Sequence, residues 1–475
     1  MDRNAMSAEP RAGLPDDVDV LIIGGGLAGH CAAISARQTG ASVAIAEKEP
    51  VCGGSSALSG GSFAFAGTVQ QAEQGIDDSL ERLHADLLEV GGHHNERSLV
   101  DLYVSRQLET YQWLRELGVE FQTVQLSSNM SRPRSHPAFP KQLMATLKNR
   151  AEELGVLFET DASARRLVRD QNTGIVKGVV VESTHGTRTI SARKGVILAT
   201  GGFARSETLV QTFVPRQAAA LRLGGHGSTG DGIEMAWALG AAVADIGYVS
   251  ATFGIPWPDF PGSNRRYDGE RPLTHAMYRG GIIVNRNARR FLSEANSYKV
   301  LGEHCLDQPD AIGFQVFDQS VMAQSVKTPI THDYAHALEL GLILKADTIV
   351  DLAGMVGLDP TELSATVERY NSFVDDGADL DFGRRTLGKG YGRIVRIATP
   401  PFYILPCAAA LFTTYGGLKV NDRMQVVAIT GEPIEGLYAV GEVIGGFHGQ
   451  GYMSGSALGK AAIFGKVAGA LLGHS

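Results

Sequence analysis

The sequence predicts an α/β fold, and three observations support this class. Residues 18–23 form a short apolar run typical of a buried parallel strand, residues 27–38 follow with helical spacing, and residues 42–46 are apolar again. Gly24 and Gly26 lie between the first strand and the helix, and Gly29 lies in the first turn of the helix. The chain's 58 glycines are clustered, which indicates places where the backbone approaches something closely.

Length and composition restrict the class of protein. A chain of 475 residues favours more than one domain, and a net charge of −8 argues against a nucleic-acid partner. Cys31, Cys52, Cys305 and Cys407 are scattered without a C-x-x-C pair, which favours reduced thiols, a cytoplasmic location and no metal site.

The chain ends give no sign of membrane insertion. Residues 1–17 are polar and read as a loose N-terminal tail without a signal peptide. No uninterrupted apolar run reaches membrane-spanning length, so we expect no integral membrane segment.

The first glycine cluster predicts a dinucleotide site. Gly24 permits a tight turn, Gly26 lets the main chain approach a pyrophosphate, and Gly29 lets the helix pack closely on the strand. The pyrophosphate would lie at the N-terminus of the helix, and Glu47, at the end of the second strand, would bind ribose hydroxyls. At this stage the nucleotide is either a nicotinamide or a flavin cofactor.

A second loop, CGGSSALSGGSFAFAG (residues 52–67), follows the acidic residue. With this loop the chain resembles the flavoproteins of the fumarate reductase and 3-ketosteroid dehydrogenase superfamily. The resemblance implies FAD as the cofactor. Covalent members carry a histidine in this loop where the chain has Gly54, so we expect the FAD to be bound non-covalently.

The resemblance continues through residues 196–206, 225–241, 280–299 and 433–459. It implies a Rossmann-like FAD-binding domain, residues 18–246 plus 413–475, interrupted by an α+β capping domain, residues 247–412. The cofactor-binding residues that it implies are Gly24, Gly26, Leu27, Ala28, Gly29, Glu47, Lys48, Gly53, Gly54, Ser55, Ser56, Ser59, Gly60, Gly61, Ala164, Thr200, Gly201, Asp231, Gly441, Glu442, Ser456, Ala457 and Leu458.

The stretch GQGYMSGSALGKAAIFGKVAG (residues 449–469) opens the last helix, predicted over residues 457–472. Ala461, Gly465 and Gly469 form a stripe of small residues suited to close helix contact. The first amides of the helix have no intrahelical acceptor, and in the family they face the pyrimidine edge of the flavin.

The family's carboxylate-binding residues differ in this chain. Dicarboxylate-reducing relatives have histidines where Thr252 and Thr413 stand, and arginines where Tyr298 and Tyr452 stand. Because carboxylates are best bound by arginine and histidine, succinate and fumarate are expected to be poor substrates.

The tyrosines resemble those of the 3-ketosteroid dehydrogenases, and the Tyr452-x-Ser454 pair is most like the Δ4-(5α) enzymes. The resemblance implies that Tyr452 and the amide of Ser456 hold a ketone oxygen while Tyr298 moves the proton. Hydrogen bonds to the oxygen stabilise enolate charge, and a tyrosinate with a lowered pKa serves as base. Tyr298, Tyr452 and Ser454 are the expected catalytic residues, and Thr252, Thr413, Tyr415 and Gly455 the expected substrate contacts.

Alternatives remain at this stage. Tyr298 could be a packing residue, Ser454 could cap the last helix or relay a proton, and a loop role suits Arg134 and His136 better than a functional one. The main hypothesis is an FAD-dependent oxidoreductase that desaturates, or in reverse reduces, a hydrophobic ketone with an external electron acceptor or donor. The others are a fumarate- or tricarballylate-type enzyme acting on a carboxylate, and a flavoprotein subunit that only transfers electrons.

Overall fold

The computed structural model describes residues 13–327, 329–388 and 390–474, which form two compact units. The first unit contains the described residues up to Leu209, Gly224–Val249 and the chain from Thr413 onward. The second contains Val210–Leu223 and Ser250–Phe412. Each unit is built around its own main sheet.

The first unit has a central sheet whose middle strands are parallel. Its order is β17-β18-β8-β1-β2-β5, and β1, β2, β5, β8 and β18 run in one direction. β6 and β7 pair antiparallel as a hairpin with its turn near residue 173, and β7 also pairs antiparallel with β8. The strands are β1 (Asp17–Ile23), β2 (Val43–Ala46), β5 (Leu157–Glu159), β6 (Ser163–Arg169), β7 (Val176–Ser183), β8 (Gly186–Leu198), β17 (Gln425–Val427) and β18 (Pro433–Ala439).

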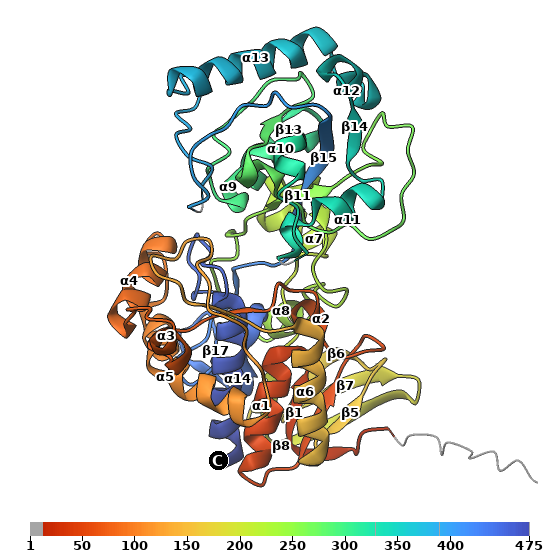
Figure 1. The fold of residues 1–475 in the computed structure, drawn as a ribbon. Helices are drawn as coiled ribbons and strands as arrows, with labels where there is room; N and C mark the ends of the chain where they lie inside the picture. Colours follow the sequence, from red (N-terminus) through yellow and green to blue (C-terminus); the bar gives the residue numbers. More distant parts are fainter. Residues whose placement is uncertain (1–12, 328, 389, 475) are drawn as a thin grey trace, which may run out of the picture. The chain divides into compact units, whose positions relative to one another are not determined.

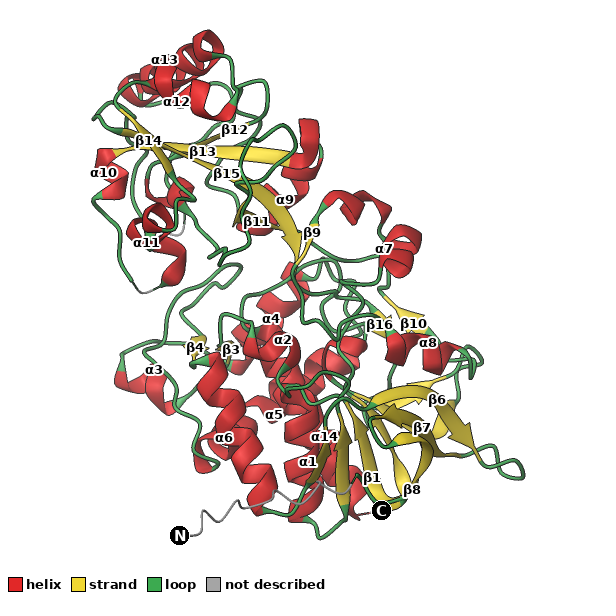
Figure 2. Cartoon of the chain, turned by 90° about the vertical axis from the view of Figure 1, so that its right-hand side faces the viewer, coloured by secondary structure: helices red, strands yellow, loops and turns green. Residues whose placement is uncertain are grey.

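Helices cover the parallel strands, while the β6–β7 hairpin extends on the other side (Figure 2). The helices of the first unit are α1 (Leu27–Gln38), α2 (Gly54–Ala57), α3 (Val69–Glu73), α4 (Leu80–Val90), α5 (Arg97–Glu116), α6 (Pro140–Glu153), α8 (Asp231–Trp237) and α14 (Ser456–His474). Two small ladders, β3 (Ser62–Ala64) with β4 (Ser135–Pro137) and β10 (Val243–Ala244) with β16 (Gly417–Leu418), complete the unit.

Helices α1 and α14 lie side by side although they come from opposite ends of the chain (Figure 1). A Cβ added at Gly465 would lie 3.1 Å from Cβ of Cys31 and would overlap the carbonyl of Ala28. One added at Gly469 would overlap the carbonyl of Ala32. The predicted stripe of small residues is therefore the contact face between the last helix and the helix of the dinucleotide unit.

The second unit is an α+β arrangement around a mainly antiparallel sheet of order β11-β15-β13-β12, with β14 and β9 also paired to β15. Its strands are β9 (Leu221–Arg222), β11 (Thr252–Pro256), β12 (Ile282–Val284), β13 (Ile312–Asp318), β14 (Leu344–Ala346) and β15 (Phe402–Leu411). Its helices are α9 (Tyr298–Leu306), α10 (Gln319–Met322), α11 (Tyr334–Glu339), α12 (Ile349–Val356) and α13 (Pro360–Asp376), and α7 (Glu207–Phe213) spans the boundary between the units. Ile282, Phe314 and Val316 of the sheet pack with Leu352 and Leu363 of α12 and α13 as its core.

Two details differ from the sequence-based domain limits. Residues 210–223, expected in the first domain, belong to the second unit because β9 pairs with β15 and Arg216 pairs with Asp307. Residues 1–12 of the expected tail lie outside the described residues, but the rest of that segment is not loose. Leu14 is buried and its amide donates to Glu159, and Asp17 begins β1.

Among the described residues, α14 alone has the length and composition to cross a membrane, with a mean hydropathy of 1.2. In the structure 72% of that window is buried within the protein. Its packing on α1 accounts for this apolar character, as in the core helix of a folded domain.

Candidate functional site

The loop between β1 and α1 has the geometry of a nucleotide-binding turn. Gly24 has a φ of +108°, and a Cβ there would lie 2.7 Å from the carbonyl carbon of Ala199. A Cβ on Gly29 would overlap the carbonyl of Gly24. At Gly26, by contrast, the nearest atom to an added Cβ is Oγ of Ser56 at 3.8 Å. Gly24 and Gly29 therefore serve internal packing, while the main chain at Gly26 is open to a ligand.

Glu47 lies directly after β2 and is buried. Its two carboxylate oxygens accept hydrogen bonds from the amides of Gly25 at 2.7 Å and Glu49 at 2.9 Å. Burial raises the pKa of this carboxyl, and the two amides oppose the shift. Each oxygen keeps a second lone pair, so ribose hydroxyls would supply the donors that a buried carboxylate needs.

The second glycine-serine loop packs on the first. The amide of Gly53 donates to the carbonyl of Gly25 at 2.9 Å, and Oγ of Ser56 accepts from the amide of Leu27, the first residue of α1, at 3.2 Å. Within the loop, Oγ of Ser59 accepts from the amide of Gly61 at 3.1 Å. The two cofactor loops, separated in the sequence, thus form one continuous surface at the N-terminus of α1.

Ser55 and Lys48 connect these loops to the segment before α8. Oγ of Ser55 accepts from the amide of Gly225 at 3.0 Å. Lys48 forms an ion pair of 2.7 Å with Asp231, the first residue of α8, and a hydrogen bond with Thr229. Lys48 and Asp231 are therefore close together, as the family resemblance implies.

The other expected cofactor residues lie at strand ends of the same unit. Thr200 and Gly201 follow β8, and the hydroxyl of Thr200 is buried without a hydrogen-bond partner in the described structure. Glu442 follows β18, accepts from the amide of Thr414 at 2.9 Å, and has its pKa raised by burial. Ala164 lies in β6 opposite Val181.

These residues fit an FAD molecule. The open main chain at Gly26, the first-turn amides of α1 and the buried Glu47 are suited to a pyrophosphate and a ribose. The unpartnered hydroxyl of Thr200 is a group that a bound cofactor would satisfy.

The glycines before α14 have a different explanation from a bound ligand. A Cβ at Gly449 or Gly451 would overlap the carbonyls of Gly91 or Val90, and one at Gly455 would lie 2.8 Å from the amide nitrogen of Ala64. This segment is glycine-rich because other parts of its own domain approach it closely. The same contacts hold Tyr452 in place.

Tyr452 belongs to a group of three neighbouring rings, of which those of Tyr452 and Tyr415 are stacked. Its ring lies 5.9 Å from that of Tyr415 at an interplanar angle of 11°, and 5.6 Å from that of His448. His448 is buried, with Nδ1 at 3.5 Å from Oγ of Ser456. The Tyr452 hydroxyl accepts a long hydrogen bond of 3.4 Å from the amide of Gly455.

One expectation for this segment requires correction. The amide of Ser456, expected to bind a ketone oxygen, donates to the carbonyl of Met453 at 3.1 Å and is already used. Ser454, for which a helix cap and a proton relay are both open, lies two residues before Ser456, the first residue of α14. Ser454 is buried, and its amide donates to the carbonyl of Ser128 at 3.1 Å.

Tyr298, in the second unit, is the first residue of α9, whose N-cap is Ser297. Its ring stacks on that of His275 at 5.5 Å and 16°, and His275 meets Tyr278 at 5.4 Å. The ammonium of Lys299 lies 5.9 Å from the centre of the Tyr298 ring. The sequence analysis did not identify three neighbours of Tyr298. His275 and Tyr278 are close to it only in space, and Lys299 is the next residue of α9.

The turn that carries Tyr298 is fixed by buried charges. Arg290 donates two hydrogen bonds to Glu294, of 2.8 and 2.7 Å. Arg290 also pairs with Asp379 at 2.9 Å, and Arg384 pairs with Glu294 at 3.1 Å. These buried ion pairs hold the segment that leads into α9.

The two threonines differ in setting. Thr252 is the first residue of β11, opposite Ala410, and its side chain is buried. Thr413 begins the return of the chain to the first unit and is partly exposed. Both remain expected substrate contacts.

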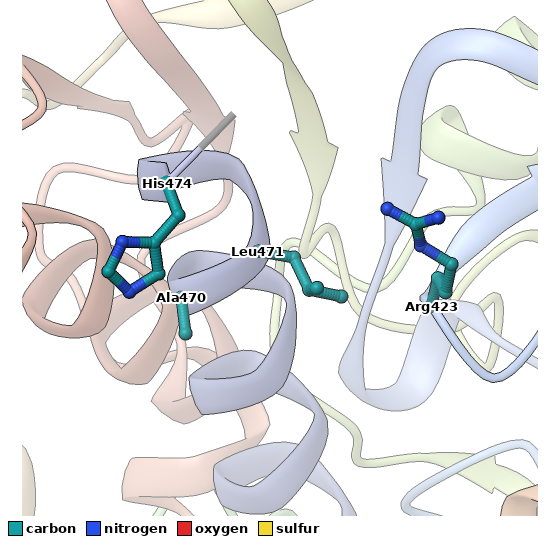
Figure 3. Close-up of a pocket in the computed structure, with 4 residues that line it drawn as sticks. All are labelled: Arg423, Ala470, Leu471 and His474. Carbon is teal, nitrogen blue, oxygen red and sulfur yellow. The ribbon is translucent and has the colours of Figure 1, made fainter.

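A pocket of about 340 Å³ lies elsewhere in the first unit (Figure 3). Arg423, Ala470, Leu471 and His474 line it, at the C-terminal end of α14. The cofactor residues of this helix are at its opposite end, and 19 helical residues span roughly 28 Å. This pocket is therefore not the candidate site.

Comparisons with known proteins agree with this geometry. A family model described as FAD binding domain matches residues 19–458. The chain belongs to this family. It is 31% identical to urocanate reductase of Eggerthella lenta, over 98% of this chain and 76% of that protein. It is 30% identical to vinyl phenol reductase of Lactiplantibacillus plantarum, over 96% of both chains.

Two solved structures are similar throughout. One is the open conformation of a flavocytochrome c3 fumarate reductase, with a TM-score of 0.84, 29% identity and coverage of 97% of this chain and 79% of that one. The other is 3-ketosteroid-Δ4-(5α)-dehydrogenase from Rhodococcus jostii in complex with 4-androstene-3,17-dione, with a TM-score of 0.75, 26% identity and coverage of 98% and 99%.

These findings confirm the expected superfamily, the α/β fold and FAD as the cofactor. The protein is an FAD-dependent oxidoreductase that acts on CH–CH groups. It uses a small-molecule substrate and an electron donor or acceptor.

Proposed function

We propose that the protein interconverts a C–C single bond and a C=C double bond next to the ketone of a hydrophobic, ketosteroid-like substrate. The observation that carries this proposal is the pair Tyr298 and Tyr452, at positions where dicarboxylate-reducing relatives have arginines. An arginine fork pairs with a carboxylate, whereas a neutral phenol is suited to a ketone oxygen. Similarity to a ketosteroid dehydrogenase structure supports this assignment.

Tyr452 would bind the ketone oxygen. Its ring is fixed by Tyr415 and His448, so the hydroxyl is held with little loss of side-chain freedom. The amide of Gly455 would be the second donor, because its 3.4 Å hydrogen bond to the phenol is long and readily exchanged. Two donors on that oxygen stabilise the enolate charge that develops when the neighbouring carbon loses a proton.

Tyr298 would move that proton, as base in the dehydrogenation and as acid in the reduction. When bound, FAD accepts a hydride from the substrate or returns one to it. The residues around Tyr298 suit a proton-transfer group, because His275 stacks on its ring and the Lys299 ammonium lies nearby.

Reduction of unsaturated carboxylates is the second candidate. It is supported by similarity to proteins named fumarate reductase, urocanate reductase and acrylate reductase flavoprotein subunit. Vinyl phenol reductase, 30% identical over 96% of both chains, is a relative named for a neutral, oxygen-bearing compound.

An anaerobic panel distinguishes these candidates. The oxidised holoenzyme is mixed with saturated 3-ketosteroids, succinate or tricarballylate, and loss of flavin absorbance is followed. The dithionite-reduced enzyme is mixed with a 3-keto-4-ene steroid, fumarate, urocanate or 4-vinylphenol, and flavin reoxidation is followed. We expect the ketones to react fastest. Reaction with carboxylates alone would refute the ketone assignment.

The proposal includes three further statements. The FAD is non-covalent, the electron donor or acceptor is a separate molecule, and the protein resides in the cytoplasm. The buried thiols of Cys31, Cys305 and Cys407 support the last of these, because a reducing compartment keeps cysteines unpaired.

A further inference from the structure

The turn formed by residues 126–134 contacts the segment that carries Tyr452. Nδ2 of Asn129 donates a hydrogen bond of 2.7 Å to the carbonyl of Tyr452. Two residues further along, the amide of Ser454 donates to the carbonyl of Ser128 at 3.1 Å. Residues 450–453 have no helix or strand pairing, so their position depends on such individual bonds.

Asn129 is suited to this contact by its backbone as well as its side chain. Its φ is +61°, a left-handed conformation that asparagine adopts more readily than most residues. The side chain is exposed, so packing does not determine its direction. Its bond to the Tyr452 carbonyl, 323 residues away, is what orients it.

Arg134 fixes the turn through buried ion pairs. Its guanidinium is fully buried and pairs with both oxygens of Asp78 at 3.0 and 2.8 Å, and with Oδ2 of Asp86, on α4, at 2.6 Å. Oδ2 of Asp86 also accepts from the amide of Ser131 at 3.0 Å. Bidentate pairing of buried charges fixes direction as well as distance, so these ion pairs attach the turn to α4.

We propose that Asn129 is a positioning residue of the active site. It fixes the Tyr452 peptide, and through it the orientation of the phenol toward the substrate oxygen. Arg134 makes the turn rigid enough for this purpose. The inference rests on the proposed role of Tyr452 and adds to it a residue that no part of the chain's sequence pattern indicates.

The test uses the FAD-loaded protein and a double-mutant cycle. Asn129→Asp keeps the shape and tolerates the left-handed backbone, but it presents a carboxylate to the Tyr452 carbonyl in place of a donor. We expect kcat/KM to fall roughly 10- to 10²-fold, because small displacements of a positioned group are costly. In a Tyr452→Phe background the same change should have almost no further effect, since no hydroxyl remains to be positioned.

The controls separate positioning from folding and from substrate identity. Asn172→Asp makes the same change in the exposed β6–β7 turn and should leave rate, FAD content and melting temperature unchanged. The cycle is run with whichever panel compound reacts fastest, so a wrong substrate assignment does not affect it. The ultraviolet titration of the Tyr452 phenol is obtained by subtracting the titration of the Tyr452→Phe variant from that of the protein with Tyr452. We expect this difference titration to shift in the Asn129→Gly variant as well.

Two results would overturn the inference. One is an equal loss of rate from Asn129→Asp with and without the Tyr452 hydroxyl. The other is a wild-type rate together with an unchanged phenol titration in both Asn129 variants.

Discussion

At the residue scale, the proposed roles of the two tyrosines predict different failures. Tyr452→Phe removes a donor from the developing oxyanion, so turnover should fall on the order of 10²-fold or more. Binding of an unreactive ketone analogue should weaken as well, because the hydrogen bond also exists in the ground state. Stopped-flow flavin kinetics and analogue titration measure the two effects. Unchanged turnover and analogue binding would return Tyr452 to a packing role with Tyr415 and His448.

Tyr298→Phe removes the proposed proton-transfer group. We expect turnover to fall about 10²- to 10⁴-fold with little change in analogue affinity. One limb of the pH–rate profile should disappear, since it reports the ionisation of this phenol. Rates across pH 6–10 provide the measurement. A Tyr298→Phe profile that keeps both limbs would assign the ionisation to another group, and His275, stacked on Tyr298, would be the first to examine.

Lys460 provides a prediction about stability. It is buried in α14, its ammonium donates to the carbonyl of Ile444 at 3.3 Å, and burial lowers its pKa to about 8, opposed by Glu442 and Asp245. The pKa of lysine in the unfolded chain is near 10.5. Below pH 8 Lys460 is therefore charged in both the folded and the unfolded state, and burial of this charge destabilises the folded state. Between these two pH values the unfolded chain binds more protons, and stability from this group rises with pH.

Lys460→Met should therefore stabilise the protein at pH 7 by up to about 3 kcal/mol. The advantage should decrease between pH 8 and 10.5, as the wild-type lysine loses its proton in the folded state. Urea denaturation of the holoenzyme at several pH values measures it. A destabilised variant that has also lost FAD would indicate that the ammonium serves the cofactor instead.

At the scale of elements, the contact between α1 and α14 is decided by glycines. Gly469→Ala places a Cβ on the backbone of Ala32, and neither helix can yield without shifting the other. We expect a loss of about 1–3 kcal/mol, seen as a lower melting temperature. Gly354→Ala, inside α12 with nothing within 4 Å, is the matched control and should be neutral or stabilising. Equal effects of the two changes would mean that helix propensity alone is at work.

The contact between α1 and α14 also links the two ends of the chain. The last helix packs on the helix of the dinucleotide unit, so the segment with Tyr452 is placed relative to the loops at Gly26 and Ser56. Deletions after residue 455 should therefore impair FAD binding as well as catalysis.

At the scale of the whole molecule, FAD should be released by acid precipitation, leaving a yellow supernatant. The loop at residues 52–61 has no histidine, and its one cysteine, Cys52, is a poor nucleophile because burial raises its pKa to about 11. Absorbance of the supernatant at 450 nm measures the released flavin. Yellow colour that stays with the pellet would contradict non-covalent binding.

The sequence by itself was sufficient for the nucleotide-binding unit. The strand, the three glycines, the helix and Glu47 lie within residues 17–47, so their local spacing determines one supersecondary unit and indicates a dinucleotide as its ligand. The stripe Ala461, Gly465 and Gly469 likewise predicted a close helix contact, because side chains four residues apart share one helix face.

Only the tertiary structure decided what lies next to the two tyrosines. Asn129 contacts Tyr452, and His275 stacks on Tyr298, across sequence separations that no local pattern encodes. The structure also decided that Gly449 and Gly451 are glycines because Gly91 and Val90 approach them, and that residues 210–223 join the second unit through β9. Long-range pairing of this kind depends on where the chain returns in space, whereas helix periodicity and turn chemistry depend on neighbours along the chain.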